Sequence, residues 1–302
     1  SGVYISTNDG GDWSKINNGL TNLSIKALCV SGNNIYAGSY GEGIFISSNN
    51  GINWFASNTG LTNKKVLSLQ SQSNNIFAGT LGDGIYFSND NGNNWLPINN
   101  GITDTIVNTI SFSGTNIFAG TQNSGIFTTT NNGASWNSVN SGLTSPTIYS
   151  LTTSGANLYA GTGNGLFIST NLGNSWNSIG FTSNSTRVIS ISSPYIFAGN
   201  WNSGLYMSSN NGVDWFHKNH GLINLNVNSL YVSNGYVFAG FYGSSLWRRL
   251  FNEIINVKKI SEILPDKFLL DQNIPNPFNP STIIRYQIPI NVKSQMSNVK
   301  LI

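Results

Sequence analysis

The fold is decided by the stretch Ser47-Ser48-Asn49-Asn50-Gly51-Ile52-Asn53-Trp54, because its pattern, Ser/Thr-x-Asn/Asp-x-Gly-x-x-Trp, occurs six times in the chain of 302 residues. Successive copies are 41, 41, 41, 40 and 39 residues apart, and they end at Trp13, Trp54, Trp95, Trp136, Trp176 and Trp215. A repeat of about 40 to 45 residues, made of short strands and Gly-rich turns, is typical of four-stranded units in a propeller or an array. We therefore predict an all-β repeat fold.

The eight residues have the chemistry of a tight hairpin turn. The short side chain of Asn49 can accept hydrogen bonds from backbone N–H groups just ahead of it, and Gly51 can adopt the positive φ that such a turn needs. Ser47 can bond across the loop. Trp54 can bury a large ring while its indole N–H reaches a carbonyl. These roles predict a structural device rather than a reactive site.

The octapeptide resembles the Asp-box (BNR) repeat, written S-x-D-x-G-x-x-W, and the resemblance covers residues 1 to about 250. It implies a β-propeller similar to sortilin-like and photosystem-assembly-factor-like propellers, in which the box is a hairpin at the edge of a blade, away from the ligand. The six boxes here are structural, and five of them carry Asn where the family has Asp. Their turn residues are Asn8, Asn49, Asp90, Asn131, Asn171 and Asn210, and their tryptophans are those given above.

Each repeat is predicted to form one antiparallel blade of four short strands. In one complete unit the expected strands are residues 66–69, 75–79, 84–88 and 95–98, all bounded by Gly, Asn and Ser. The third-strand pattern occurs seven times and the first-strand pattern six times, so we predict seven blades with an incomplete first one. The alternative is six blades, with the amino-terminal strands completing the last sheet. Because residues 2–6 match a third strand, we expect the protein to extend further at its start.

Composition and charge restrict the functions to consider. Charged residues make up 8% of the chain, and residues 1–245 hold six Lys/Arg against seven Asp/Glu, so the propeller has no basic stripe for nucleic acid. The single cysteine, Cys29, excludes an internal disulfide. We predict no metal site and no cofactor, since His217 and His220 have no third ligand near them. No apolar run is long enough to span a membrane, and we expect a monomer.

The chain changes character after Trp247. We assign residues 1–250 to the propeller, 251–265 to a linker and 266–302 to a second domain. The run Gln272-Asn273-Ile274-Pro275-Asn276-Pro277-Phe278-Asn279-Pro280-Ser281-Thr282, within residues 266–289, resembles the start of the carboxy-terminal sorting domain of the type IX (Por) secretion system. The resemblance implies a truncated β-sandwich, recognition by that machinery, and a secreted or outer-membrane surface location in a Bacteroidetes-like bacterium.

A ligand is expected at the loops between second and third strands, opposite the octapeptide turns. Aromatic rings among amide and carboxyl groups at these loops suit stacking on sugar rings, so carbohydrate is a plausible ligand. The predicted ligand-binding residues are Tyr40, Glu42, Asp83, Gln122, Trp201, Phe241 and Tyr242.

We predict a secreted or cell-surface, non-catalytic propeller that binds a polysaccharide, a glycoprotein or a protein partner. The alternative is an extracellular glycoside hydrolase with a carboxylate pair. Its candidate residues are Glu42 and Asp83, which occupy matching positions in adjacent blades, with Asp104 as a third carboxylate. A sialidase is excluded because its three arginines are missing: the repeats contain Arg187 alone before the Arg248–Arg249 pair.

Overall fold

The computed structural model describes residues 1–182, 184–243, 246–255, 269–270 and 286–287. Contacts divide the chain into two units, Ser1–Phe251 and Asn252–Ile302. In the second unit, the two-residue strands β26 (Leu269–Leu270) and β27 (Tyr286–Gln287) pair antiparallel. Most of the predicted linker and the sorting motif lie outside the described residues, so both remain predictions.

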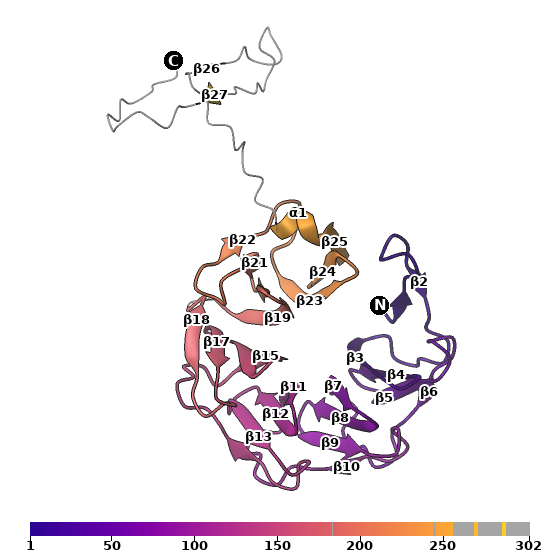
Figure 1. The fold of residues 1–302 in the computed structure, drawn as a ribbon. Helices are drawn as coiled ribbons and strands as arrows, with labels where there is room; N and C mark the ends of the chain where they lie inside the picture. Colours follow the sequence, from indigo (N-terminus) through magenta and orange to yellow (C-terminus); the bar gives the residue numbers. More distant parts are fainter. Residues whose placement is uncertain (183, 244–245, 256–268, 271–285, 288–302) are drawn as a thin grey trace. The chain divides into compact units, whose positions relative to one another are not determined.

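The first unit is a β-propeller of six blades, which are antiparallel sheets arranged around a common axis (Figure 1). The first three blades are β3 (Ile25–Ser31), β4 (Asn34–Ser39), β5 (Ile44–Ser47) and β6 (Phe55–Ala56); β7 (Val66–Gln72), β8 (Asn75–Thr80), β9 (Ile85–Ser88) and β10 (Leu96–Pro97); and β11 (Val107–Ser113), β12 (Asn116–Thr121), β13 (Ile126–Thr129) and β14 (Asn137–Ser138).

The next two blades also have four strands, and the sixth has three. They are β15 (Ile148–Ser154), β16 (Asn157–Thr162), β17 (Gly165–Ser169) and β18 (Asn177–Gly180); β19 (Thr186–Ser192), β20 (Tyr195–Asn200), β21 (Gly204–Ser208) and β22 (Phe216–His217); and β23 (Val227–Ser233), β24 (Tyr236–Phe241) and β25 (Leu246–Leu250), which is followed by α1 (Phe251–Ile255). The prediction of an all-β propeller with four-stranded antiparallel blades is confirmed.

A separate two-stranded sheet precedes the first blade. It consists of β1 (Tyr4–Ile5) and β2 (Ser14–Lys15), which pair with each other. These strands have the third- and fourth-strand positions of a repeat, as expected for an incomplete first blade. They do not hydrogen-bond to β25 to complete the last sheet.

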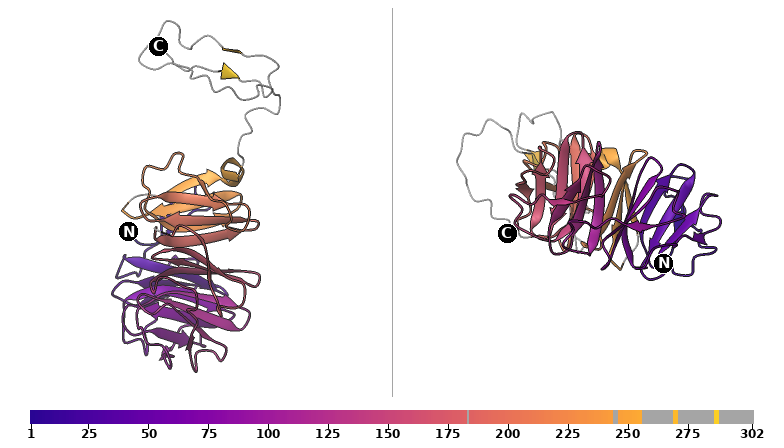
Figure 2. Two further views of the ribbon diagram at one scale, coloured as in Figure 1. Left: turned by 90° about the vertical axis from the view of Figure 1, so that its left-hand side faces the viewer. Right: turned by 90° about the horizontal axis from the view of Figure 1, so that it is seen from below.

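The inside of the ring is lined by the first strands of the blades, β3, β7, β11, β15, β19 and β23, and the other strands follow outward (Figure 1). Figure 2 shows the same ring from two further sides. The second to fifth blades are therefore covered on both faces by their neighbours (Figure 1). The second strands are buried on both faces for this reason: Ile76, Phe77 and Ala78 of β8 have no exposed surface. Such strands are apolar at successive positions instead of alternating.

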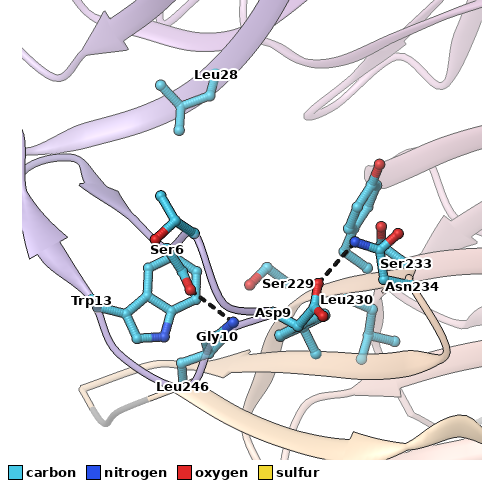
Figure 3. Close-up of a pocket in the computed structure, with 13 residues that line it drawn as sticks. Ser6, Asp9, Gly10, Trp13, Leu28, Ser229, Leu230, Ser233, Asn234 and Leu246 are labelled. Carbon is cyan, nitrogen blue, oxygen red and sulfur yellow. Dashed lines mark hydrogen bonds between the residues drawn. The ribbon is translucent and has the colours of Figure 1, made fainter. Parts of the chain in front are cut away.

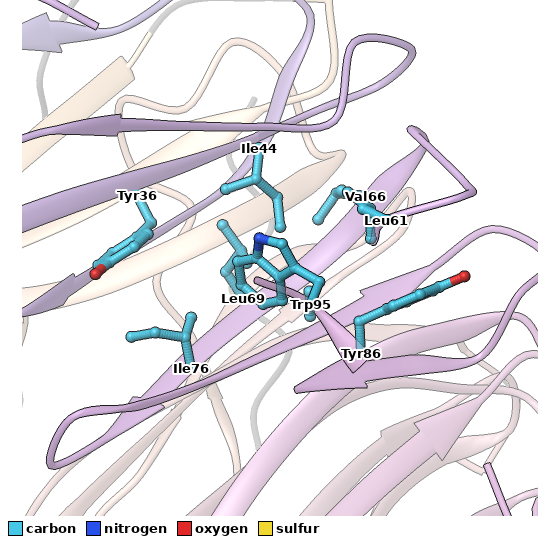
Figure 4. Packing of buried hydrophobic residues seen from close by; sticks show 9 residues of the cluster. Tyr36, Ile44, Leu61, Val66, Leu69, Ile76, Tyr86 and Trp95 are labelled. Carbon is cyan, nitrogen blue, oxygen red and sulfur yellow. The ribbon is translucent and has the colours of Figure 1, made fainter. Parts of the chain in front are cut away.

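Four of the six octapeptide tryptophans, Trp54, Trp95, Trp136 and Trp176, are buried between neighbouring sheets, whereas Trp215 is half-buried and Trp13 is 45% exposed. Trp95 is 1% exposed and packs against Tyr36 and Ile44 of the preceding blade and Val66 and Leu69 of its own (Figure 4). Its indole N–H donates to the carbonyl of Ser57 in the preceding blade at 2.9 Å. The indoles of Trp54, Trp136, Trp176 and Trp215 donate to the preceding repeat in the same way, so these tryptophans both fill space between sheets and link them.

The octapeptide forms the predicted turn. Asn49 Oδ1 accepts from the Asn53 backbone N–H at 2.9 Å, and Ser47 Oγ accepts from the Gly51 N–H at 2.8 Å. Gly51 has a φ of +83°, and a Cβ there would lie 2.3 Å from Ile16 Cδ1. Only glycine meets both requirements.

Candidate ligand-binding face

The two ends of the blades carry different kinds of connection. We call the end with the octapeptides (residues 6–13, 47–54, 88–95, 129–136, 169–176 and 208–215) the turn face. The opposite end is the loop face, formed by the second-to-third-strand loops (residues 39–43, 80–84, 121–125, 162–165, 200–204 and 241–243) together with the connections into each first strand.

A constant backbone supports the loop face. In each blade, the residue that begins the second-to-third-strand loop donates its backbone N–H to the connection that enters the first strand. Examples are Tyr40 N to Ser24 O at 2.8 Å and Trp201 N to Ser185 O at 3.0 Å. The side chains at this loop position differ from blade to blade: Tyr40, Leu81, Gln122, Gly163, Trp201 and Tyr242. The fold thus presents changeable side chains on a fixed frame.

Every first strand also carries a β-bulge next to this face. The pairing between first and second strands shifts by one residue at the second position of the first strand, as between Thr186 and Val188 in β19. A bulge re-aims the side chain of the extra residue, and bulges are common beside functional sites. The bulged residues are Lys26, Leu67, Asn108, Tyr149, Arg187 and Asn228. This ring of positions was not predicted from the sequence.

Four of these loop and bulge residues form a cluster on the fourth to sixth blades. The guanidinium carbon of Arg187 lies 3.7 Å from the ring centroid of Tyr149 and 4.9 Å from that of Trp201. The Trp201 and Tyr242 rings are 5.5 Å apart. Trp201 and Tyr242 were predicted as ligand-binding residues from the sequence, whereas Tyr149 and Arg187 were not. We call these four residues the Arg187 cluster.

The charge of Arg187 has no acidic partner among the described residues. Its Nε is buried and makes no hydrogen bond, and the two aromatic rings contact it through their faces. Arginine stacks on aromatic rings and still offers its N–H groups in the plane of the guanidinium, where a carboxylate or a similar anion can accept two of them. The cluster therefore combines a positive charge with stacking surfaces.

A second unpaired polar side chain, Asn200, is the last residue of β20 and directly precedes Trp201. Both side-chain polar atoms of Asn200 are buried without a partner, and the residue has no exposed surface. In the other four-stranded blades this position is a serine or threonine: Ser39, Thr80, Thr121 or Thr162. Each of these hydroxyls donates a hydrogen bond to a glycine carbonyl at the start of the third strand, as Thr80 Oγ1 does to Gly84 O at 2.9 Å. Buried polar groups are nearly always paired. Asn200 has no exposed surface, so its amide leaves one donor and one acceptor unpaired in the interior and does not line the loop face.

Three other predicted ligand-binding residues, Tyr40, Gln122 and Phe241, lie apart from the Arg187 cluster. Tyr40 is 40% exposed, and the ammonium groups of Lys26 and Lys65 lie 5.5 and 5.7 Å from its ring centroid. Gln122 accepts a hydrogen bond from the bulged residue Asn108 at 2.9 Å. Phe241 is half-buried at the end of β24. None of these three residues has a ring or hydrogen-bond contact with the Arg187 cluster among the described residues.

The carboxylates singled out for catalysis have different surroundings. Asp83 Oδ2 accepts from Thr62 Oγ1 at 2.8 Å and from the Tyr86 hydroxyl at 3.4 Å. Glu42 is exposed, and no hydrogen bond joins it to Asp83. Asp104 is 9% exposed and accepts backbone N–H bonds from Ile106 and Asn123. Asp104 therefore holds a loop in shape.

The described residues contain no group of three or more His, Cys, Asp or Glu side chains that could hold a metal ion. Burial raises the pKa of the Cys29 thiol to about 12, so this side chain stays protonated and is a poor nucleophile at neutral pH. Within the described part of the chain, no helix is long and apolar enough to cross a membrane.

Solved structures resemble this fold. An ancestral GH74 enzyme superposes with a TM-score of 0.64 at 22% identity, over 82% of this chain and 38% of that one. YCF48 bound to D1 peptide has a TM-score of 0.60 at 14% identity, over 76% and 80%. PorZ, a surface component of the type-IX secretion system of Porphyromonas gingivalis, has a TM-score of 0.60 at 14% identity, over 87% of this chain and 43% of PorZ. These three proteins share the fold of this chain.

At these identities the likeness concerns the fold and not the activity. This chain spans less than two fifths of the ancestral enzyme's length. No protein-family profile matches the chain, and no curated protein matches it. The structures with this fold include both enzymes and a peptide-bound propeller, so the fold by itself leaves the function open.

Proposed function

We propose that this chain is a non-catalytic binding module whose loop face binds an extracellular glycan that carries acidic groups. The observation that supports this most is the Arg187 cluster, in which an arginine without an acidic partner lies over two aromatic rings. Tyr242, 65% exposed, extends the aromatic surface next to Trp201. Sugar rings stack on such faces, and a uronate or sulfate group would pair with the guanidinium.

A binding assay with matched polysaccharides tests this proposal. We expect polygalacturonate or alginate to bind the chain more tightly than neutral xyloglucan, as measured by isothermal titration calorimetry. Arg187→Gln should remove the preference for the acidic polymers, and Trp201→Ala should weaken binding to them at least tenfold. Phe55→Ala is the control, because Phe55 is an exposed aromatic residue (64%) on an outer strand away from the loop face.

The competing function is an extracellular glycoside hydrolase that uses Glu42 and Asp83. A reducing-sugar assay on the same polysaccharides separates the two functions. Turnover that is lost in both Glu42→Gln and Asp83→Asn would replace the binding module by the enzyme. We expect none, because the Asp83 carboxylate already accepts hydrogen bonds from Thr62 and Tyr86. Binding of a protein but of no polysaccharide would overturn the glycan ligand and keep the binding role.

We also propose that the protein acts outside the cell and is exported through its carboxy-terminal segment. PorZ is described as a bacterial surface component, and other propellers with this fold form the extracellular domain of the protein BT4673. The export proposal depends on the sorting-domain resemblance of residues 266–289. Deletion of residues 266–302 in a host with type IX secretion should retain the protein inside the cell, whereas unchanged export would exclude this route.

A further inference from the structure

A cavity of about 730 Å³ lies beside the hairpin β1–β2, and polar groups along its lining bond to one another. Asn234 donates to Asp9 Oδ1 at 2.9 Å, and the Gly10 N–H donates to Ser6 Oγ at 2.8 Å (Figure 3). Among the described residues, no side-chain polar atom that is buried without a hydrogen bond belongs to this cavity. The interior groups that still need a partner therefore lie elsewhere.

These unpaired groups lie together at the fourth and fifth blades. Within the described part of the chain, they are Ser150 Oγ, Thr186 Oγ1, Arg187 Nε and both polar atoms of Asn200. Thr186 and Asn200 have no exposed surface, and they are register partners on β19 and β20. Directly opposite residues of an antiparallel pair point to the same face of the sheet, with their Cβ atoms about 4.5–5.5 Å apart. The polar atoms of these two residues therefore lie in the same layer of the interior.

Both residues depart from the repeat at this pair of positions. In the other blades the first-strand position holds a β-branched apolar residue: Ile25, Val66, Val107, Ile148 or Val227. Thr186 has the shape of valine but carries a hydroxyl group. Asn200 stands where the other four-stranded blades have a serine or threonine that bonds within its own loop. Two polar changes at one register pair indicate a polar partner that the other blades do not need.

The Thr186 side chain faces the fourth blade. A Cβ on Gly161 of β16 would lie 3.1 Å from Thr186 Cγ2 and 2.5 Å from Ser150 Oγ, so these residues meet between the two sheets. Ser150 Oγ is itself buried without a hydrogen bond. A third unpaired polar group thus lies in the same layer as Thr186 and Asn200.

The equivalent layer between the second and third blades has the same frame, and its hydroxyls are paired. A Cβ on Gly79 would lie 2.4 Å from Ser68 Oγ and 2.8 Å from Val107 Cγ1. Ser68 Oγ donates to Val107 O at 3.4 Å. Thr121, the register partner of Val107, donates its hydroxyl to Gly125 O at 2.8 Å. The unpaired atoms of the other layer therefore follow from its two residue changes and not from the backbone.

We propose that the layer between the fourth and fifth blades holds an ordered interior water, bound by Thr186, Asn200 and Ser150. Buried polar groups without a protein partner are normally bonded to such a water, which makes about three hydrogen bonds. A water donates to Asn200 Oδ1 and accepts from the Asn200 amide or a hydroxyl, so it suits a set that contains both donors and acceptors. An anion would leave Asn200 Oδ1 without a donor, and a cation would lie close to the charge of Arg187, the residue next to Thr186. Because Thr186 and Asn200 have no exposed surface, this water is separate from the loop face and from the glycan proposed to bind there.

An exchange of residue pairs between blades tests the proposal. Thr186→Val/Asn200→Thr gives the fifth blade the pair that the third blade has, Val107 and Thr121. Val107→Thr/Thr121→Asn gives the third blade the pair of the fifth. Oxygen-17 relaxation dispersion of the full chain counts the interior waters that exchange slowly with the solvent. We expect this count to fall by one in the first variant and to rise by one in the second, relative to the original chain.

A crystal structure of the original chain shows where the water lies. We expect it within about 2.5–3.2 Å of the Asn200 amide and of Thr186 Oγ1. Circular dichroism checks that the first variant keeps the fold, which is expected because its new residues are those of another blade. Equal water counts in the original chain and the first variant would overturn the proposal, whatever the second variant shows. A direct hydrogen bond between the Thr186 and Asn200 side chains, with no water beside them, would overturn it as well.

Discussion

The turn face and the loop face of this propeller are built from the same repeats and differ in what the repeats keep constant. On the turn face the same hydrogen bonds recur: Ser47 with Gly51, Ser88 with Gly92 and Ser169 with Gly173 are all 2.8 Å long. On the loop face the backbone bonds recur, but the side chains change at every blade. Constancy at one end indicates a scaffold, and variation at the other places the candidate site there.

The largest effect that would sharpen this comparison is expected from Trp95→Ala. The change removes a ring that is 1% exposed and leaves the Ser57 carbonyl without its donor, so the free energy of unfolding should fall by about 3–5 kcal/mol. Chemical denaturation followed by circular dichroism measures it. Trp13→Ala is the matched control, because Trp13 is 45% exposed; a loss as large as that of Trp95→Ala would show that burial between blades is not the cause.

The next effect is expected from Ser88→Ala, which tests the hydrogen bonds of the turn itself. Ser88 is 1% exposed, and its hydroxyl accepts from the Gly92 N–H and donates to Asp90. Loss of a partner for a buried N–H should lower the free energy of unfolding by about 1–3 kcal/mol. Ser48→Ala, at an exposed position of a neighbouring octapeptide, should have no measurable effect. Equal effects of the two changes would contradict a structural role for the turn hydroxyl.

On the loop face, Arg187→Gln should lower the free energy of unfolding by about 0.5–2 kcal/mol, because it removes the stacking of the guanidinium on the Tyr149 and Trp201 rings. The same change should lower the affinity for an acidic polysaccharide at least tenfold. Thermal unfolding and calorimetric titration of one preparation measure both. A large loss of stability with unchanged binding would reverse the roles assigned to the two faces.

The smallest effect concerns pH. Hydrogen bonds from the side chain and backbone of Asn94, and from Ser88, lower the pKa of Asp90 from 3.8 to about 2. A lowered pKa means that the ionised form stabilises the fold above pH 4 and that this contribution is lost as the pH falls toward 2. Asp90→Asn should remove this part of the acid dependence, as followed by Tm between pH 2 and 5. Unchanged acid dependence would assign it to other carboxylates.

The fold could be predicted in detail from the sequence because six copies of the repeat carry the same pattern of strands and turns. The strands expected at residues 66–69, 75–79, 84–88 and 95–98 are β7 to β10, with β7 extending to Gln72 and β10 limited to Leu96–Pro97. The roles of Asn49, Ser47, Gly51 and Trp54 in the turn are confirmed. All these properties are local, or follow from contact between neighbouring repeats.

The candidate site was predicted less completely. Trp201 and Tyr242 stood out as aromatic residues in variable loops, but Arg187 and Tyr149 lie within strands whose pattern gives no sign of a bulge. Alignment of the repeats offered one signal: the second residue of each first strand is Lys, Leu, Asn, Tyr, Arg or Asn. Asn200 offered another, since it replaces a Ser or Thr. The contact between Arg187 and Trp201 depends on three-dimensional register and required the structure.

The glycine next to the end of each second strand has a consequence for how such a molecule can change over generations. A Cβ at Gly38 or Gly120 would collide with Val66 or Ile148 of the following blade, so successive blades of the first five meet at the same close spacing. A gene duplication that adds or removes one whole repeat therefore creates a junction that already fits. Such proteins can change the diameter of their ring in single genetic steps without inventing a new interface.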